Sequence, residues 1–412
     1  MHRWIAAQAI RFKESIHILG LDMSRAFDTI NRTKLLDILK NDVGLNEDEL
    51  RMCQCLLANT SLQVKFEEFL SDPFQTTIGT PQGDALSPVL FIIYFEKALK
   101  DIRKESKVKP KEDEGLPSEA VYADDADFIS SSKKYLQDLE GKIPKLIEPY
   151  ELIASSSNWE RTEITIEGEG TQGMGIMGWK KVKKLGSPLG DREDSEDIEK
   201  RMSLASVQFK SLENLWKSSH SLSLSSKLRA YNALVLSVLL YNAGTWGVND
   251  KVFHELDVFH RGHLRRILCI KWPKTISNKD LYEKCGSERL SEIIRKHRWQ
   301  LFGHVLRLPK DTPAQMSMFH YCNSFKEKQV EKGRPLTTLP IVLFNEYHSY
   351  KQSLRKSGYR QKPITALNEL LKIASKRNDW AELVKNVCYI HSNKAGTESE
   401  ENNELLTSTS RL

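Results

Sequence analysis

The sequence contains no hydrophobic run long enough to cross a membrane. Its longest apolar stretch, residues 233–241, falls far short of the ~20 residues that span a bilayer. Arg11, Lys13 and Glu14 interrupt the N-terminus and leave no signal-peptide core. Six cysteines in 412 residues form no CxxC pair and no Cys/His ligand spacing, so neither a zinc knuckle nor a disulfide framework is expected. These absences predict an intracellular protein, nuclear or cytoplasmic, with no membrane partner.

The sequence has instead a globular composition and one concentration of positive charge. Hydrophobic residues make up 40% and charged residues 28% of the chain, which allows a sizeable core divided over two or three domains. The net charge is +6, yet residues 251–310 alone hold fourteen Lys/Arg against six Asp/Glu, an excess of eight. A concentrated basic region neutralises phosphates, so nucleic acid is the expected partner class.

Hydrophobic patterning divides the chain into a mixed α/β part and a helical part. Residues 16–21 are a short apolar run typical of a buried strand, Asn31 is a good helix N-cap, and Pro88 opens a second helix. Residues 121–129 follow a strand–turn–strand pattern. The polar tail from Lys394 is expected to be disordered. In the second half of the chain the spacing of apolar residues predicts helices at 198–216, 226–241, 251–269, 279–285, 288–306 and 364–377.

Three separate segments carry carboxylates or glycines in positions suited to phosphate chemistry. Asp22 follows a buried strand, where a carboxylate can hold a metal ion, although most such aspartates cap helices or lie on the surface. Residues 79–84 are a glycine-containing loop that leads into a helix; it allows close backbone approach to a ligand and also fits an ordinary turn. Asp124 and Asp125 are adjacent in a turn, where divalent cations or solvent would relieve their repulsion.

Together the three segments predict one carboxylate facing two others. Such a cluster of hard oxygen ligands selects Mg²⁺ or Mn²⁺ and can hold two ions ~3.5–4 Å apart. One ion would activate an attacking 3′-hydroxyl, and the other would neutralise the triphosphate and the departing pyrophosphate. The chemistry expected from these residues is therefore two-metal nucleotidyl transfer, with no further small-molecule cofactor.

The same segments resemble motifs A, B and C of reverse transcriptases, specifically those of non-LTR (LINE-type) retrotransposons. The resemblance extends over about residues 10–390. A group II intron maturase-like protein is another reading of these motifs, but the C-terminal phrases fit non-LTR elements better. The phrases that carry the resemblance are, in order, LDMSRAFD, GTPQGDALSPVLF, YADD, SNWERTEITI, KKLGSPLGD, YNAGTW, RRILCIKWPKTISNKDL and RWQLFGHVLRLP, with weaker matches in KGRP and ASKRNDW.

The resemblance implies a metal-binding role for four residues. Asp22, Asp124 and Asp125 match the catalytic aspartates that bind the metal ions, and the carbonyl of Met23 matches an additional ligand. All three aspartates of the family pattern are present, which implies an intact metal centre.

The resemblance also implies a nucleotide-binding set. Phe27 matches the aromatic gate that would clash with a ribose 2′-hydroxyl and so select dNTP. Gln82 and Gly83 match the loop that lies against the incoming nucleotide and the template. Arg161 stands where the family usually has a lysine; an arginine stays charged and pairs with pyrophosphate only electrostatically, so efficient proton donation is not expected.

The fold implied is α+β: a right-hand polymerase palm, with an antiparallel sheet and packed helices, followed by a helical thumb and a helical C-terminal extension. Because motif A begins only some 20 residues into the chain, the fingers are expected to be largely absent. The expected domains are the palm at 1–190, the thumb at 191–275, the basic extension at 276–393 and a disordered tail at 394–412.

Basic residues of the thumb and extension are expected to face the phosphates of an RNA template and DNA primer. Trp272 and Trp299 lie among them; they could stack on bases, but we expect both to fill the core. The basic residues are Arg261, Arg265, Arg266, Lys271, Lys274, Arg295, Lys296 and Arg298.

The function that follows is RNA-directed DNA polymerisation in a non-LTR retrotransposon. The alternative is a catalytically inactive retrotransposon remnant that retains RNA binding. The three intact aspartates favour the enzyme, and the missing fingers favour the remnant.

Overall fold

The chain divides into two compact units. Residues 15–182 form the first, called here the sheet unit, and residues 1–14 with 183–412 form the second, called the helical unit. The structure, a computed structural model, describes residues 1–23, 27–58, 60–81, 83–105, 113–153, 159–164, 183–184, 187–188, 193–217, 222–327, 337–354 and 362–391.

The sheet unit contains a four-stranded antiparallel sheet in the order β6-β7-β1-β8. β1 is therefore a central strand, paired on both edges. Its residues alternate between the two faces of the sheet, so that Leu19 and Leu21 enter the hydrophobic core while Gly20 and Asp22 occupy the alternate positions. The strands are β1 (Ile16–Asp22), β6 (Glu119–Tyr122), β7 (Asp125–Ser130) and β8 (Trp159–Ile164).

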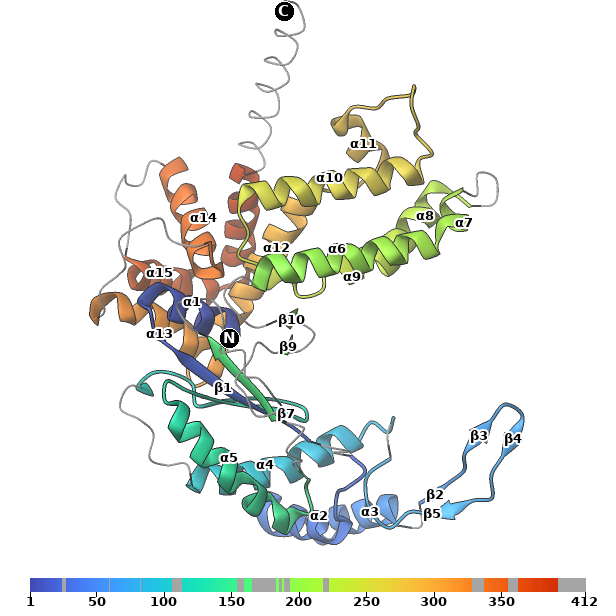
Figure 1. The fold of residues 1–412 in the computed structure, drawn as a ribbon, viewed down its shortest axis with the longest axis vertical. Helices are drawn as coiled ribbons and strands as arrows, with labels where there is room; N and C mark the ends of the chain where they lie inside the picture. The colour runs from blue at the N-terminus through green and yellow to red at the C-terminus, as the bar shows by residue number, and fades with distance from the viewer. Residues whose placement is uncertain are drawn as a thin grey trace, which may run out of the picture. The chain divides into compact units, whose positions relative to one another are not determined.

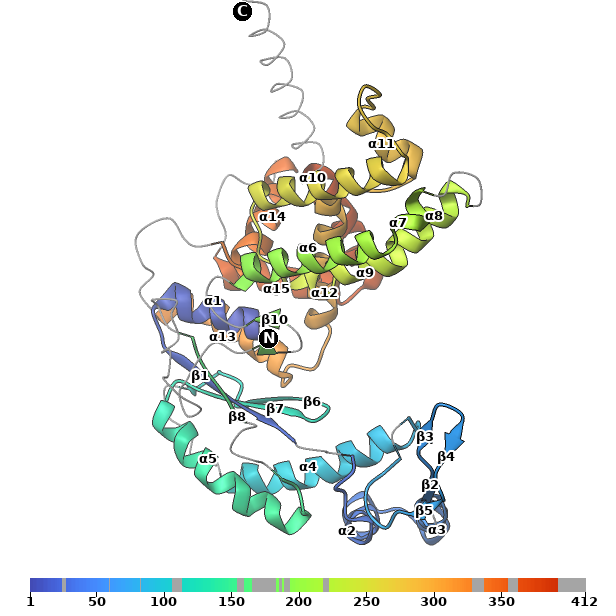
Figure 2. The same cartoon turned by 45° about the vertical axis from the view of Figure 1, so that its right-hand side comes forward.

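Helices cover one face of this sheet. α4 (Ser87–Glu105) and α5 (Lys133–Ile147) run along it (Figures 1 and 2), and their side chains Phe91 and Leu136 are fully buried in the same core cluster as Leu19. α2 (Arg32–Ile38), a π turn at Leu39–Val43, α3 (Glu47–Leu57) and a 3₁₀ turn at Glu148–Tyr150 complete the unit's helices among the described residues.

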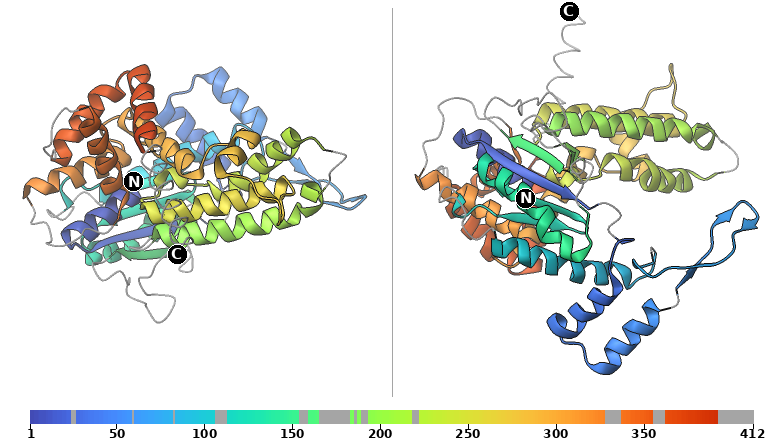
Figure 3. Two further views of the ribbon diagram at one scale, coloured as in Figure 1. Left: turned by 90° about the horizontal axis from the view of Figure 1, so that it is seen from above. Right: turned by 60° about the horizontal axis from the view of Figure 1, so that its bottom comes forward.

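A narrow ribbon of paired strands projects beyond α3 (Figures 1 and 3). Phe66 and Phe69, at its far end, are 72% and 75% exposed. Residues 61–66 alternate between polar and apolar, but the ribbon was not predicted from the sequence, and every residue of its strands is exposed in the structure. The strands are β2 (Ser61–Leu62), β3 (Lys65–Phe66), β4 (Phe69–Leu70) and β5 (Phe74–Gln75), with β2 paired to β5 and β3 to β4.

The helical unit consists mainly of helices that pack through two buried hydrophobic clusters. Among the described helices, none combines the length and apolarity needed to span a bilayer. Its elements are α1 (His2–Phe12), β9 (Lys183–Lys184), β10 (Ser187–Pro188), α6 (Glu193–Ser211), α7 (Glu213–Lys217), α8 (Leu224–Tyr231), a π turn (Asn232–Leu236), α9 (Ser237–Leu239), a 3₁₀ turn (Ala243–Thr245), α10 (Asp250–Ile267), α11 (Asn278–Cys285), α12 (Leu290–Leu306), α13 (Pro313–Glu327), α14 (Leu339–Ser353), α15 (Pro363–Ala374) and a last helix over residues 377–391.

The N-terminal helix α1 belongs to the helical unit although it is far from it in sequence. Trp4 is buried and stacks on Phe302 at a ring-centroid distance of 6.1 Å, and its ring meets Tyr321 edge to face at 5.6 Å. The sequence-based boundary at residue 190 assigned residues 1–14 to the palm, whereas these contacts attach them to α12 and α13.

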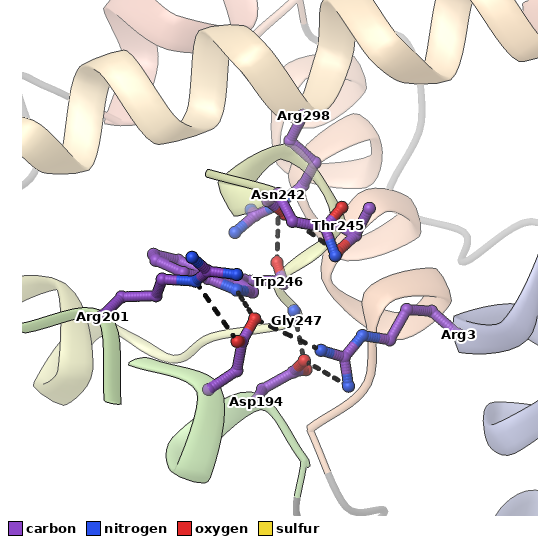
Figure 4. A network of polar contacts seen from close by, with 9 residues as sticks. Arg3, Asp194, Arg201, Asn242, Thr245, Trp246, Gly247 and Arg298 are labelled. Atoms are coloured by element: carbon purple, nitrogen blue, oxygen red, sulfur yellow. Dashed lines mark hydrogen bonds and ion pairs between the residues drawn. The ribbon is translucent and has the colours of Figure 1, made fainter. Parts of the chain in front are cut away.

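Polar contacts join the same helix to α6 (Figure 4). The Arg3 guanidinium lies 2.9 Å from a carboxylate oxygen of Asp194, whose other oxygen accepts a hydrogen bond of 2.9 Å from the backbone N–H of Gly247. The indole N–H of Trp246 donates to Asp197, also at 2.9 Å. Residues from three distant parts of the sequence are therefore held together by the carboxylates of the first turn of α6.

A buried ion pair joins α12 to α14. Glu346 accepts hydrogen bonds from Arg295 and Arg298, each at 2.9 Å, and from the indole N–H of Trp299 at 2.7 Å. All four side chains are buried. Burial alone would raise the pKa of Glu346, but the two arginines hold it below its usual value, so the carboxylate is charged.

The α+β class expected from the sequence is confirmed, and so are the strand at 16–21, the helices beginning after Asn31 and near Pro88, the strand–turn–strand at 121–129, and the predicted helices of the second half. Asn31 caps α2 as expected, accepting a hydrogen bond from the backbone of Lys34. The helices at residues 2–12, 47–57, 133–147, 313–327, 339–353 and 377–391 were not predicted. The tail from Lys394 lies outside the described residues.

We expect Glu346→Ala to lower the free energy of unfolding of the helical unit by about 3–5 kcal/mol, because it leaves two buried guanidinium groups without a counter-charge. Chemical denaturation followed by circular dichroism measures the effect. Asp379→Ala is the control, since it removes an exposed ion pair with Lys376 and should change stability little. Equal effects of the two substitutions would contradict this account of Glu346.

Candidate metal centre and nucleic-acid interface

The register of the central sheet brings the first and third acidic segments together. β1 and β7 are antiparallel, and their last pair is Asp22 opposite Asp125. Directly opposed residues in such a pair share a face, with Cβ atoms about 4.5–5.5 Å apart. Asp124 precedes Asp125 in the tight turn between β6 and β7, where Ala123 has a positive φ of 54°. Backbone pairing therefore gathers the three predicted catalytic aspartates at one end of the sheet.

The same face carries one further carboxylate. Asp127, two residues beyond Asp125 on β7, is buried and pairs with Gly20 of β1. Residues two apart on a strand share a face, so Asp127 lies behind the Asp22–Asp125 pair. The alternate residues Leu21 and Phe128 belong to the hydrophobic core, which places the carboxylates on the face opposite α4 and α5.

These oxygen donors fit a hard divalent cation such as Mg²⁺ or Mn²⁺. For Asp22 and Asp125 this conclusion rests on the pairing of their backbones. Among the side chains that the structure describes, no group of three or more His, Cys, Asp or Glu residues forms a metal-binding cluster, and the Asp22 side chain lies outside that set. Met23, whose carbonyl was the expected extra ligand, has its side chain buried in the core directly after β1.

The glycine-containing loop lies directly on the segment that follows Asp22. The backbone N–H of Thr80 donates to the Phe27 carbonyl, and that of Gly79 donates to the Ile30 carbonyl, both at 2.8 Å. Gly79 has a φ of +75°, and a Cβ at this position would come within 2.8 Å of the Asp28 carbonyl oxygen. Only glycine fits here, both for its conformation and for the close approach of two backbones.

Arg32, which sequence reasoning missed, holds this loop in place. Its guanidinium donates to the backbone carbonyls of Leu57, Thr76, Ile78 and Gly79 at distances of 2.7–3.1 Å, and also to the Thr76 hydroxyl. Burial lowers the pKa of Arg32, but an arginine remains charged. All these acceptors lie at least 25 positions away in sequence, so no local signal marks the residue.

The predicted nucleotide-binding residues differ in where the structure places them relative to the end of β1. The Phe27 ring packs against Phe91 of α4 at a centroid distance of 4.9 Å, which fixes it beside the end of β1. Gly83 has a φ of +90° and open space around it, and Gln82 lies outside the described residues. Arg161 pairs with Leu19, a core residue, whereas its neighbour Glu160 pairs with Gly20. The register therefore does not place Arg161 in the set of positions shared by Asp22 and Asp125.

The basic region divides into exposed and buried cations. On α10, Arg266 is exposed and Arg261 and Arg265 are half-buried, because the opposite side of the helix packs into the core through residues such as Leu264 and His260. Burial lowers the pKa of His260 to about 3, so this imidazole is neutral. In the helical unit Lys271, Lys274 and Lys296 are also exposed.

For two of the basic residues, the prediction that they contact phosphates is wrong. Arg295 and Arg298 were predicted to face nucleic acid, but their guanidinium groups are buried and paired with Glu346. Counting charge in the sequence does not reveal this, because the partner carboxylate is about fifty residues further along the chain. The expectation that Trp299 fills the core is confirmed; for Trp272 it is wrong, because this side chain is 90% exposed.

Comparisons with known proteins agree with the motifs. Residues 3–184 match the family described as reverse transcriptase (RNA-dependent DNA polymerase). Over 128 residues the chain is 27% identical to the Retrovirus-related Pol polyprotein from type-2 retrotransposable element R2DM of Drosophila melanogaster, which covers 31% of this chain and 12% of that polyprotein. It is 28% identical over 103 residues to the corresponding polyprotein from type-1 retrotransposable element R2 of Bradysia coprophila, covering 25% of this chain. Each match spans 12% of the relative's length.

Solved structures with partial similarity include those of telomerase from Candida tropicalis. The apo structure gives a TM-score of 0.41 at 14% identity and covers 89% of this chain and 55% of that one. The complex with the TWJ fragment of telomeric RNA gives 0.39 at 12% identity, covering 89% of this chain and 51% of that one.

We expect Arg32→Lys to loosen the loop at residues 76–80, because a lysine cannot donate to four carbonyls at once. Hydrogen exchange read by mass spectrometry should show faster exchange at the Gly79 and Thr80 amides, and unfolding should cost about 2–3 kcal/mol less. Arg51→Lys on the exposed side of α3 is the control and should change neither quantity. Unchanged exchange in Arg32→Lys would show that Arg32 does not hold the loop.

Proposed function

We propose that this chain is the RNA-directed DNA polymerase of a non-LTR retrotransposon, on the ground that residues 3–184 match the reverse transcriptase family. It adds dNTP to the 3′-hydroxyl of a DNA primer on an RNA template. The polyprotein relatives from R2 elements support the non-LTR assignment.

The observation that carries the proposal is the pairing of Asp22 with Asp125, with Asp124 in the adjoining turn. These residues, together with the Met23 carbonyl, would hold two Mg²⁺ or Mn²⁺ ions. Such ions supply activation of the 3′-hydroxyl and neutralisation of the triphosphate. Asp22 and Asp125 come from directly paired strands, so the sheet sets their backbone positions and little backbone ordering would be needed at the moment of reaction.

The neighbouring segments then position the nucleotide. The Phe27 ring, fixed against Phe91, lies five residues after Asp22 and would exclude a ribose 2′-hydroxyl. The loop of Gln82 and Gly83 follows a segment held by Arg32, and its backbone would lie against the incoming base pair. Arg161 is not part of this proposed nucleotide site, because it pairs with the core residue Leu19 and not with a residue on the face of Asp22.

A second function is favoured by one observation. The exposed cations predicted to bind nucleic acid, at positions 266, 271, 274 and 296, belong to the helical unit and the aspartates to the sheet unit, so this binding would not need the carboxylates. A chain with an inactive metal centre could therefore still bind RNA. Polymerisation and binding assays separate the two functions.

We expect Asp124→Asn, or Asp22→Asn, to reduce incorporation by at least about 100-fold in primer extension on poly(rA)/oligo(dT) with Mg²⁺ or Mn²⁺, because each removes a charged metal ligand. The melting temperature should hold or rise, since one of several repelling carboxylates is neutralised. Asp138→Asn, on the exposed side of α5, should retain parental incorporation. Parental incorporation by either active-site variant would contradict the two-metal assignment, and an inactive parent that binds RNA would favour the remnant.

The second prediction of this function concerns salt. Reversing the charge of Arg266, Lys271 and Lys274, three exposed cations, should flatten the slope of log K against log salt for RNA by about two to three units, because each phosphate contact releases counterions. Filter binding over a range of salt measures the slope. The matched control reverses Arg51, Lys100 and Lys145, which are exposed on the sheet unit. If both triple variants give the same slope, these three cations of the helical unit are not the interface.

A further inference from the structure

Trp272 is the one tryptophan of known exposure that does not contribute to a core. Five others, at positions 4, 216, 246, 299 and 380, are at most 5% exposed, whereas Trp272 is 90% exposed. An indole offers a large apolar area and usually buries it, so an indole held in water marks a surface that contacts something else.

The loop that presents Trp272 is fixed by hydrogen bonds. The N–H of Ile270 donates to the Arg265 carbonyl at 2.9 Å, which ties the loop to the last turn of α10. The N–H of Lys274 donates to the Lys271 carbonyl, also at 2.9 Å, and closes a turn with Trp272 inside it. Ile276 then packs against the core, and α11 begins after Ser277. Both ends are anchored, so the backbone that carries Trp272 is held in place.

The charged residues near Trp272 in the sequence are all basic. Residues 258–279 contain six Lys/Arg and no Asp or Glu. Lys271 and Lys274 are the first and last residues of the turn, so their Cα atoms lie within about 7 Å of each other, and Trp272 is one of the two residues between them in the chain. Both lysines are exposed. An exposed aromatic ring flanked in the chain by two cations is complementary to a nucleotide: the ring can stack on the flat base, and the cations can pair with the phosphates on either side of it.

We propose that Trp272 stacks on an unpaired base of a single-stranded nucleic acid whose flanking phosphates contact Lys271 and Lys274. The inference rests on the nucleic-acid partner of the proposed function and adds the form of nucleic acid that is bound. A base inside a duplex has both faces covered by its neighbours, so only a single strand, or the end of a duplex, can use the indole. The lysines exclude a purely apolar protein partner, which would leave two ammonium groups without counter-charges.

The test compares two ligands that differ only in their bases: an oligo(rA) strand and an abasic strand of the same length, both measured with the full chain at fixed salt. Trp272→Ala should weaken binding of oligo(rA) by about tenfold or more and leave the abasic strand unaffected. Trp272→Phe should fall between, because a smaller ring still stacks. The double variant Lys271→Ala with Lys274→Ala should weaken both ligands alike, since it removes phosphate contacts only.

Tryptophan fluorescence provides an independent reading. In the parent, oligo(rA) should quench part of the emission and the abasic strand should not. Trp272→Phe should lose this quenchable part of the emission. Tyr389→Ala, which removes another exposed aromatic residue of the helical unit, is the control and should bind both strands as the parent does. The inference is overturned if Trp272→Ala binds oligo(rA) as the parent does, or if it weakens both strands equally. Neither assay needs turnover, so a chain that fails to polymerise but shows base-dependent binding contradicts only the polymerase assignment.

Discussion

The antiparallel pairing of β1 with β7 is the constraint on which the candidate metal centre depends. It sets Asp22 opposite Asp125 and, by alternation, sends Leu19 and Leu21 into the core. A slip of one residue would exchange these two sets, moving Leu19 and Leu21 out of the core cluster and the carboxylate positions into it. The hydrophobic core therefore fixes the register, and the register fixes where the carboxylates meet.

The loop at residues 76–80 depends on the same arrangement. It is bound to the segment after β1 through two backbone hydrogen bonds, through the missing side chain of Gly79, and through the guanidinium of Arg32. The carboxylates and the loop expected to touch the nucleotide are thus parts of one packed structure. In the helical unit, Glu346 neutralises the buried Arg295 and Arg298, whereas other cations of the same unit are exposed.

The sequence by itself predicted the central strand, the strand–turn–strand at 121–129 and most helices of the second half, because periodicity of apolar residues and N-caps are local signals, and the α+β class through the family resemblance; the strand at 159–164 was not predicted. Three motifs in a fixed order also predicted which aspartates act together, and the strand register pairs two of them, Asp22 and Asp125. Helices at residues 313–327 and 339–353 escaped prediction because, within the helical unit, they bury side chains such as Tyr321, Leu343 and Glu346 against several neighbours at once, which weakens a one-sided pattern.

Only the tertiary structure decided which basic residues remain available to nucleic acid and which residues support the site. Arg298 and Lys296 are two positions apart on α12, yet one is buried beside a carboxylate from α14 and the other is exposed. Arg32 finds its acceptors in segments that approach only in the folded chain, and Trp272, in a backbone turn after α10, is exposed. Each of these outcomes depends on a partner distant in sequence or on the path of the backbone, and neither is encoded in local composition.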